Sequence, residues 1–263
     1  MDYSDVLGHS IGERKVLLDD WEDLDRLLAD FPDPNEPGTF DGAAKAAKEA
    51  GEDVYKLGCW WHFLHERFWN IRGMENLMFD YYDAMDELKL LGNRLLEYYK
   101  VIVDRFKALG YDGIFTSDDL GHQTGPMMSP EIFHELYYPL YKEFIDYVHS
   151  RGMVFFLHSC GDNSLLMDDL AKAGVDVFHP IQKGCMDMEE TVEKYGSQMA
   201  FLAGFDVQHV IVEETTEDVR REVCRMKDIF KKHHGRMLMA AGNGIMPDTP
   251  FENIEAMLDE MCR

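Results

Sequence analysis

The side chains best suited to chemistry follow an apolar run. The segment 153–157 reads Met-Val-Phe-Phe-Leu, and His158, Ser159, Cys160 and Gly161 come directly after it. Such a β-branched and aromatic run predicts a buried strand. Side chains at i and i+2 share one side of a strand, and an imidazole nitrogen with a thiolate sulfur suits zinc. His158 and Cys160 are therefore candidate metal ligands, with a packed histidine beside a small buried cysteine as the alternative.

Two adjacent carboxylates, Asp118 and Asp119, end another predicted strand, 112–118. They are the candidate catalytic residues, because a carboxylate there can accept a proton from a substrate or orient it. Binding a metal and capping the following loop are the other roles that fit. Adjacent side chains on a strand diverge, so at most one of the two is expected to face the centre of a site.

Four further polar residues follow predicted strands and are candidate substrate-binding residues, namely His122, Gln182, Asp206 and Asn243. Glycines near Asp206 and Asn243 would let the backbone approach a ligand closely. His179, Gln182 and Asn243 also stand where further metal ligands would be needed. Plain turns, or a solvated surface histidine at 122, remain the alternative interpretation.

Parallel strands are needed to bring these strand ends together, and the chain has the required alternation of strands and helices. Each strand–helix unit spans about thirty residues, as expected for right-handed crossovers. A closed (β/α)₈ barrel has eight strands, but this sequence predicts six. The predicted strands are 54–61, 112–118, 153–158, 175–180, 199–204 and 237–241.

Helices are predicted between the strands, where apolar residues recur at helical spacing. Pro139 should kink or divide the third helix of the set. Residues 1–52 read as a peripheral excursion with two short helices, and the whole chain 1–263 as one domain. The predicted interstrand and terminal helices are 62–72, 75–109, 130–150, 163–173, 187–195, 216–234 and 250–262.

The composition restricts the class of partner. The 263 residues contain 26 basic and 50 acidic side chains, for a formal charge of -24, so nucleic acids and anionic membrane surfaces would be repelled. A basic partner surface stays compatible with this charge. The sequence has no long apolar run and no basic, apolar leader at its start, and its five cysteines lack a regular spacing, so we expect a cytoplasmic protein with reduced thiols.

Several common enzyme motifs are missing from the sequence. No glycine-rich phosphate-binding loop, no dinucleotide-binding glycine pattern and no Gly-x-Ser-x-Gly elbow occurs. Nucleotide-dependent and serine-hydrolase activities are therefore disfavoured.

Six motifs in order make the chain similar to the uroporphyrinogen decarboxylase superfamily, and to its cobalamin-dependent methyltransferase-like branch in anaerobic bacteria and archaea. The resemblance covers nearly the whole chain. The motifs are Phe115-Thr-Ser-Asp-Asp-Leu-Gly-His-Gln-Thr-Gly, Ser129-Pro-Glu, Tyr138-Pro-Leu-Tyr-Lys, His158-Ser-Cys-Gly, Gly204-Phe-Asp-Val-Gln and Pro247-Asp-Thr-Pro-Phe-Glu-Asn-Ile.

The resemblance implies a TIM (β/α)₈ barrel with its site at the carboxyl face. It also implies a zinc ion that activates a thiol acceptor for methylation by a methylated corrinoid protein. His158 and Cys160 would be two of its ligands. The third ligand, a cysteine in the family, falls on Asn243, and an amide oxygen is a poorer zinc ligand than a thiolate.

Matched motif by motif, residues 53–263 correspond to strands three to eight, so the first two strands of the barrel have no counterpart. An open sheet of this kind exposes its edges, which a second copy or another polypeptide could complete.

Two alternatives to methyl transfer therefore remain. One is decarboxylation of a uroporphyrinogen-type polycarboxylate, although the arginine-rich cleft of those enzymes has no counterpart here. The other is a non-catalytic subunit that docks a corrinoid protein or completes a barrel.

Overall fold

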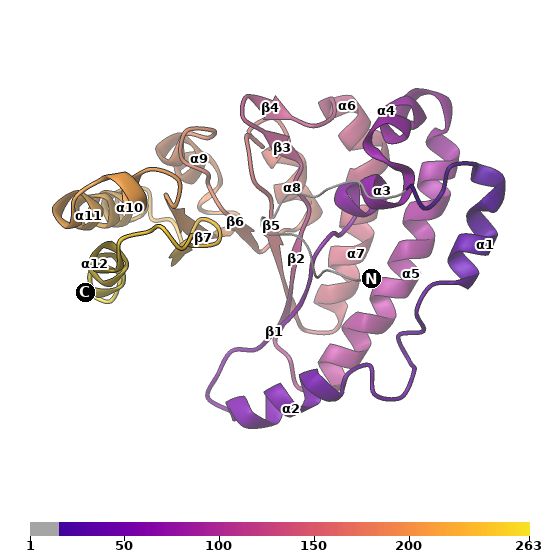
Figure 1. Ribbon diagram of the computed structural model, residues 1–263, viewed down its shortest axis with the longest axis horizontal. Helices are drawn as coiled ribbons and strands as arrows, with labels where there is room; N and C mark the ends of the chain where they lie inside the picture. The colour runs from indigo at the N-terminus through magenta and orange to yellow at the C-terminus, as the bar shows by residue number, and fades with distance from the viewer. Residues whose placement is uncertain (1–15) are drawn as a thin grey trace.

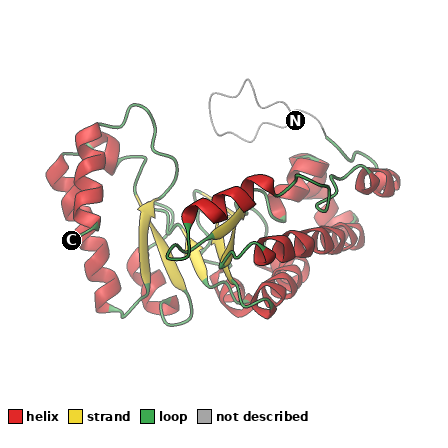
Figure 2. Ribbon diagram, turned by 90° about the horizontal axis from the view of Figure 1, so that it is seen from below, coloured by secondary structure: helices red, strands yellow, loops and turns green. Residues whose placement is uncertain are grey.

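A six-stranded parallel sheet forms the centre of the computed structural model, which describes residues 16–263. The strands lie side by side in the order β1-β2-β5-β6-β7-β8, between two groups of helices (Figure 2). Every connection is a parallel crossover, as the alternation of strands and helices predicts. The strands are β1 (Leu57–Trp60), β2 (Gly113–Ser117), β5 (Val154–His158), β6 (Val177–His179), β7 (Ala200–Phe205) and β8 (Met237–Ala241).

The sheet is an open arc, because its first and last strands, β1 and β8, do not pair with each other. This confirms the predicted barrel-type fold with six strands. The edge position of β8 is visible in its side chains, since Leu238 is 51% exposed. On an internal strand such as β5 the corresponding apolar residues, Phe155 and Leu157, are fully buried.

Helices α5 and α7 run beside the first half of the sheet, and α9 to α12 gather beside the second half (Figure 1). The helical elements are η1 (Trp21–Asp23), α1 (Leu24–Ala29), α2 (Asp41–Ala50), α3 (His65–Arg72), α4 (Met74–Asp83), α5 (Met85–Ala108), α6 (Pro130–Ile132), the π-helical turn η2 (Phe133–Tyr137), α7 (Tyr138–Ser150), α8 (Met167–Ala173), α9 (Met188–Tyr195), α10 (Val210–Glu213), α11 (Thr216–Lys232) and α12 (Phe251–Met261).

The helix predicted over 75–109 is two helices, α4 and α5, which meet at Ala84. The prediction was wrong because helix propensity is high on both sides of the break. A buried ion pair ties α4 to the end of α3: Arg72 Nε lies 2.6 Å from Asp80 Oδ2, and Trp21 Nε1 donates to the same carboxylate at 3.2 Å. Pro139 acts as expected, because the regular helix is divided by the η2 turn just before it.

Two small elements near the carboxyl ends of the strands were not predicted. One is α10, and the other is the hairpin of β3 (Gly121–His122) and β4 (Gly125–Pro126), which stands above β2 (Figure 1). The helix predicted over 163–173 begins only at Met167, because the buried Asn163 side chain bonds the loop before it. Within residues 16–263, no helix is both long enough and apolar enough to cross a membrane.

Candidate metal centre

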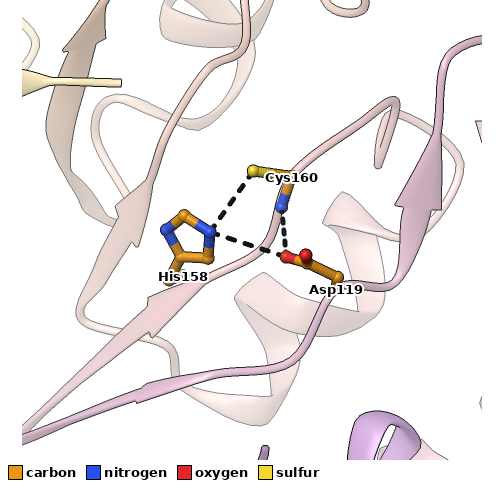
Figure 3. Close-up of side chains that lie close together, drawn as sticks. All are labelled: Asp119, His158 and Cys160. Atoms are coloured by element: carbon orange, nitrogen blue, oxygen red, sulfur yellow. Dashed lines mark hydrogen bonds and ion pairs between the residues drawn. The ribbon is translucent and has the colours of Figure 1, made fainter. Parts of the chain in front are cut away.

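Three potential metal ligands meet at the carboxyl ends of β2 and β5 (Figure 3). Asp119 follows β2, His158 ends β5, and Cys160 lies two residues further on. The Nε2 atom of His158 lies 3.3 Å from Cys160 Sγ and 3.5 Å from Asp119 Oδ1. The structure thus brings together the two predicted ligands and one of the two predicted carboxylates.

These separations fit a tetrahedral zinc site. With ordinary bond lengths, an imidazole nitrogen and a thiolate sulfur bound to one zinc ion lie about 3.6 Å apart, and a nitrogen and a carboxylate oxygen about 3.3 Å apart. The observed 3.3 and 3.5 Å each lie within about 0.3 Å of those values. All the ligand atoms lie within 4.8 Å of one another, so this part of the chain offers a possible metal site.

The loop that carries Cys160 is tied down by several hydrogen bonds. The Cys160 amide donates to Asp119 Oδ1 at 2.9 Å, and the Gly161 amide donates to Gln182 Oε1 at 2.7 Å. The Asn163 side-chain amide donates to the carbonyl oxygens of Cys160 and Gly161 at 3.0 and 3.2 Å. The thiol is therefore presented by a loop that several hydrogen bonds hold in place.

Gly161 also fits against the β3–β4 hairpin with no room for a side chain. A Cβ atom on Gly161 would lie 2.3 Å from the carbonyl carbon of Gly121, and the φ angle of Gly161 is +80°. The hairpin thus packs directly on the cysteine loop through two glycines. Asp162 reinforces the contact, because its amide donates to the carbonyl oxygen of His122 at 2.8 Å.

Replacing Gly161 with alanine is expected to lower the free energy of unfolding by about 3 kcal/mol, through backbone strain and this clash. Gly184→Ala is the matched control, because Gly184 has φ +85° but nothing within 4 Å of its Cβ position. The control should lose only about 1 kcal/mol. Urea-induced unfolding measures both, and equal losses would show that the glycine contact adds nothing.

Asp118 points away from this centre and into the core. Its carboxylate is fully buried and accepts hydrogen bonds from the backbone amides of residues 64–66. The Tyr141 hydroxyl also donates to it, at 2.7 Å. Asp118 therefore anchors the start of α3, and of the adjacent pair only Asp119 faces the candidate ligands. The segment that Asp118 caps precedes it in the chain, so it is not the following loop that the sequence suggested.

Asn243 lies beside the centre, whereas the other predicted substrate-binding residues are engaged around it. Asn243 Nδ2 is 3.5 Å from Cys160 Sγ. Gln182 bridges two loops, since its Nε2 donates to Gln208 Oε1 at 3.2 Å while its oxygen accepts from Gly161. Asp206 accepts from two amides of its own turn, and the His122 ring lies near Thr124. Their roles toward a substrate stay predictions.

A buried acidic residue that was not predicted, Glu66, contacts the chain segment that carries Asp119. It is 2% exposed, accepts a hydrogen bond from Ser117 Oγ at 2.6 Å, and lies 3.2 Å from His62 Nδ1. The Asp119 amide also bonds to it. The only sequence signal is that His62 and Glu66, four residues apart, follow the first predicted strand.

Burial determines the protonation of the candidate ligands. It lowers the pKa of His158, and it raises the pKa of the Cys160 thiol to about 12, with a further contribution from the Asp119 charge. Burial, and next the charge of Glu66, raises the pKa of Asp119 to about 6. Near pH 7 the imidazole is therefore neutral and Asp119 is mostly ionised, but the thiol must lose its proton when a metal binds.

Comparisons with known proteins place the chain in a family and a fold. The profile of the uroporphyrinogen decarboxylase family matches residues 70–263. The structure is similar to a methyltransferase from Methanosarcina mazei, with a TM-score of 0.70 and 18% identity over 83% of this chain. The matched region spans 61% of that methyltransferase. A search of curated proteins found no match.

Two other solved structures match this chain at lower similarity. The IOLI protein with a bound zinc atom has a TM-score of 0.48 and 13% identity, covering 90% of this chain and 82% of its own. A 3-keto-D-glucoside 4-epimerase from E. coli has a TM-score of 0.44 and 9% identity, covering 80% of this chain and 98% of its own.

Proposed function

This chain belongs to the uroporphyrinogen decarboxylase family, and from that premise we propose that it is a metal-assisted methyltransferase that works with a corrinoid protein. The observation that carries the proposal is the meeting of His158, Cys160 and Asp119 at distances suited to zinc. The methyltransferase with the similar fold supports the reaction class. The corrinoid protein would be the methyl source.

His158 Nε2, Cys160 Sγ and Asp119 Oδ1 would hold the metal, and Asn243 lies beside them, with its Nδ2 3.5 Å from Cys160 Sγ. Zinc bound there would lower the pKa of a thiol or water acceptor, so that a nucleophile exists near neutral pH. Asp119 would use Oδ1 for the metal, which leaves Oδ2 as the oxygen that would receive the acceptor's proton. Glu66, which bonds to the Asp119 amide, adds a second negative charge near the candidate ligands, and this charge would favour a neutral or cationic acceptor.

Decarboxylation of a polycarboxylate is less compatible with this site. Asp119 and Glu66 both place negative charge at the carboxyl ends of the strands, where such a substrate would need cationic partners. Turnover of uroporphyrinogen by metal-free protein would reverse this order of preference.

Metal analysis of the purified protein tests the proposal. The parent is expected to contain about one zinc per chain, and Cys160→Ser or His158→Ala should weaken zinc binding about a hundredfold, since each removes one of three ligands. Cys224→Ser is the matched control, because Cys224 is exposed on α11. Demethylation of methylcobalamin by a small thiol, followed by absorbance, should depend on the same residues. A parent without zinc above background would overturn the mechanism.

The open sheet favours a second role for the same chain, as a subunit that pairs through β1 or β8 with a second copy or another polypeptide. Within residues 16–263, each of the two edge strands pairs with one neighbouring strand, and an open strand edge is a template for strand addition. Light scattering with size-exclusion chromatography measures the mass in solution, and a mass well above the 30.5 kDa of one chain would indicate pairing. A stable monomer that recruits no partner would count against this role.

A further inference from the structure

Two buried histidines from neighbouring strands contact each other beside the candidate ligands. His158 ends β5 and His179 ends β6, and the two residues are paired in the register of the sheet. Their Nδ1 atoms lie 2.7 Å apart, which is a hydrogen-bond distance. Two unprotonated nitrogens would repel each other at this distance, so one of these atoms carries a hydrogen and donates it to the other.

The far side of the His179 ring determines which atom donates. His179 Nε2 lies 3.2 Å from the carbonyl oxygen of Ala241, at the end of β8. A carbonyl oxygen can only accept, so His179 Nε2 carries the hydrogen of the neutral ring and His179 Nδ1 is left as an acceptor. His158 Nδ1 must then be the donor. The Nε2 atom of His158, which faces Cys160 and Asp119, keeps its lone pair.

The burial of both rings supports this assignment. His179 is 6% exposed and the His158 side chain 12%, and burial favours the neutral imidazole. A doubly protonated His179 would donate from Nδ1 and force the hydrogen of a neutral His158 onto Nε2, which could then bind no metal. The direction of the hydrogen bond between the rings therefore decides whether His158 is a ligand.

We propose that His179 is a positioning residue that fixes the tautomer of His158, through a hydrogen-bond relay from the Ala241 carbonyl to His179 and then to His158. The relay joins the ends of β8, β6 and β5, and it prepares His158 Nε2 to bind a cation before any cation arrives. Histidine ligands of metals commonly donate their second nitrogen to such a partner, and its loss costs about 10- to 100-fold in metal affinity. The consequence for metal binding rests on the proposed function, but the tautomer does not.

Nitrogen NMR of the metal-free full chain, labelled with ¹⁵N-histidine, tests the relay directly. The expected spectrum has His158 protonated at Nδ1 and His179 protonated at Nε2 near neutral pH. In His179→Phe the acceptor is lost, and His158 should shift toward the Nε2-protonated tautomer. In His179→Asn the amide oxygen lies near the former Nδ1 position, so the parent tautomer should be partly restored. His158 protonated at Nε2 in the parent would overturn the proposal without any variant.

Zinc titration of the same proteins gives the second readout. His179→Phe should bind zinc about 10- to 100-fold more weakly than the parent, with partial recovery in His179→Asn. His65→Phe is the matched control, because His65 is a buried histidine bonded to Tyr81 and should leave the His158 tautomer unchanged. Unchanged zinc affinity in His179→Phe would contradict the relay. A parent that binds no zinc but shows the expected tautomers would overturn the proposed function and leave the relay standing.

Discussion

Between pH 8 and pH 5, the apparent affinity of the protein for zinc is expected to fall about ten-thousandfold. The main cause is Cys160, which must bind as a thiolate although its pKa is about 12. Across this whole range the thiol is protonated before the metal binds. Each unit of falling pH therefore lowers the thiolate fraction, and with it the apparent affinity, about tenfold.

Asp119 makes the fall steeper at the acidic end. Its pKa is about 6, so below pH 6 the carboxylate is also protonated and must release a second proton on binding. The slope should then approach about a hundredfold per pH unit. Cys160 and Asp119 both make the zinc affinity fall as the pH falls, because each must be deprotonated to bind the metal.

Competition with a chromophoric chelator at each pH measures this dependence, and calorimetry in two buffers counts the protons released. Cys160→Ser should remove the slope between pH 6 and pH 8, and Asp119→Asn should remove the additional slope below pH 6. An affinity that is flat between pH 6 and pH 8 would show that Cys160 is not a ligand.

Replacing Asp118 with alanine is expected to lower the free energy of unfolding by about 4 kcal/mol. The change leaves three backbone amides at the start of α3 and the Tyr141 hydroxyl without their buried acceptor. Each unsatisfied buried donor costs about 1 kcal/mol or more. Urea-induced unfolding measures the loss.

Asp119→Ala is the matched control for this prediction, because it removes an adjacent and partly exposed carboxylate that accepts one backbone amide. The expected loss in this variant is about 1 kcal/mol. Asp118→Asn keeps one acceptor oxygen, so its loss in the free energy of unfolding should lie between those of Asp118→Ala and Asp119→Ala. If Asp118→Ala loses no more than Asp119→Ala, the anchoring of α3 is not a main source of stability.

The sheet was predictable because buried strands leave a direct trace in the sequence. Apolar runs marked all six strands, and the observed bounds differ from the predicted ones by a few residues. The β3–β4 hairpin leaves no such trace, since each of its strands has two residues and the hairpin packs through Gly121. The break at Ala84 lies between two segments of high helix propensity, and the buried pair of Arg72 and Asp80 that ties α4 to α3 is a contact that only the folded chain reveals.

The candidate site was predictable only where its residues are neighbours in sequence. His158 and Cys160 were found from their spacing on one strand, but nothing in the sequence distinguished Asp118 from Asp119. The difference arises because the first turn of α3 lies over one carboxylate and not the other. Glu66 and the pairing of His179 with His158 depend on packing between separate strand–helix units.

Because β5 is an internal strand and β8 an edge strand, the two sides of the candidate site are expected to differ in their stability against local unfolding. His158 and Cys160 follow β5, which has a paired strand on each side, whereas Asn243 follows β8, which has one. Strands with fewer backbone hydrogen bonds open at lower free energy. Local opening is therefore expected to begin on the Asn243 side while His158 and Cys160 keep their positions, so the surroundings of the candidate ligands can rearrange around an incoming molecule without moving those two side chains.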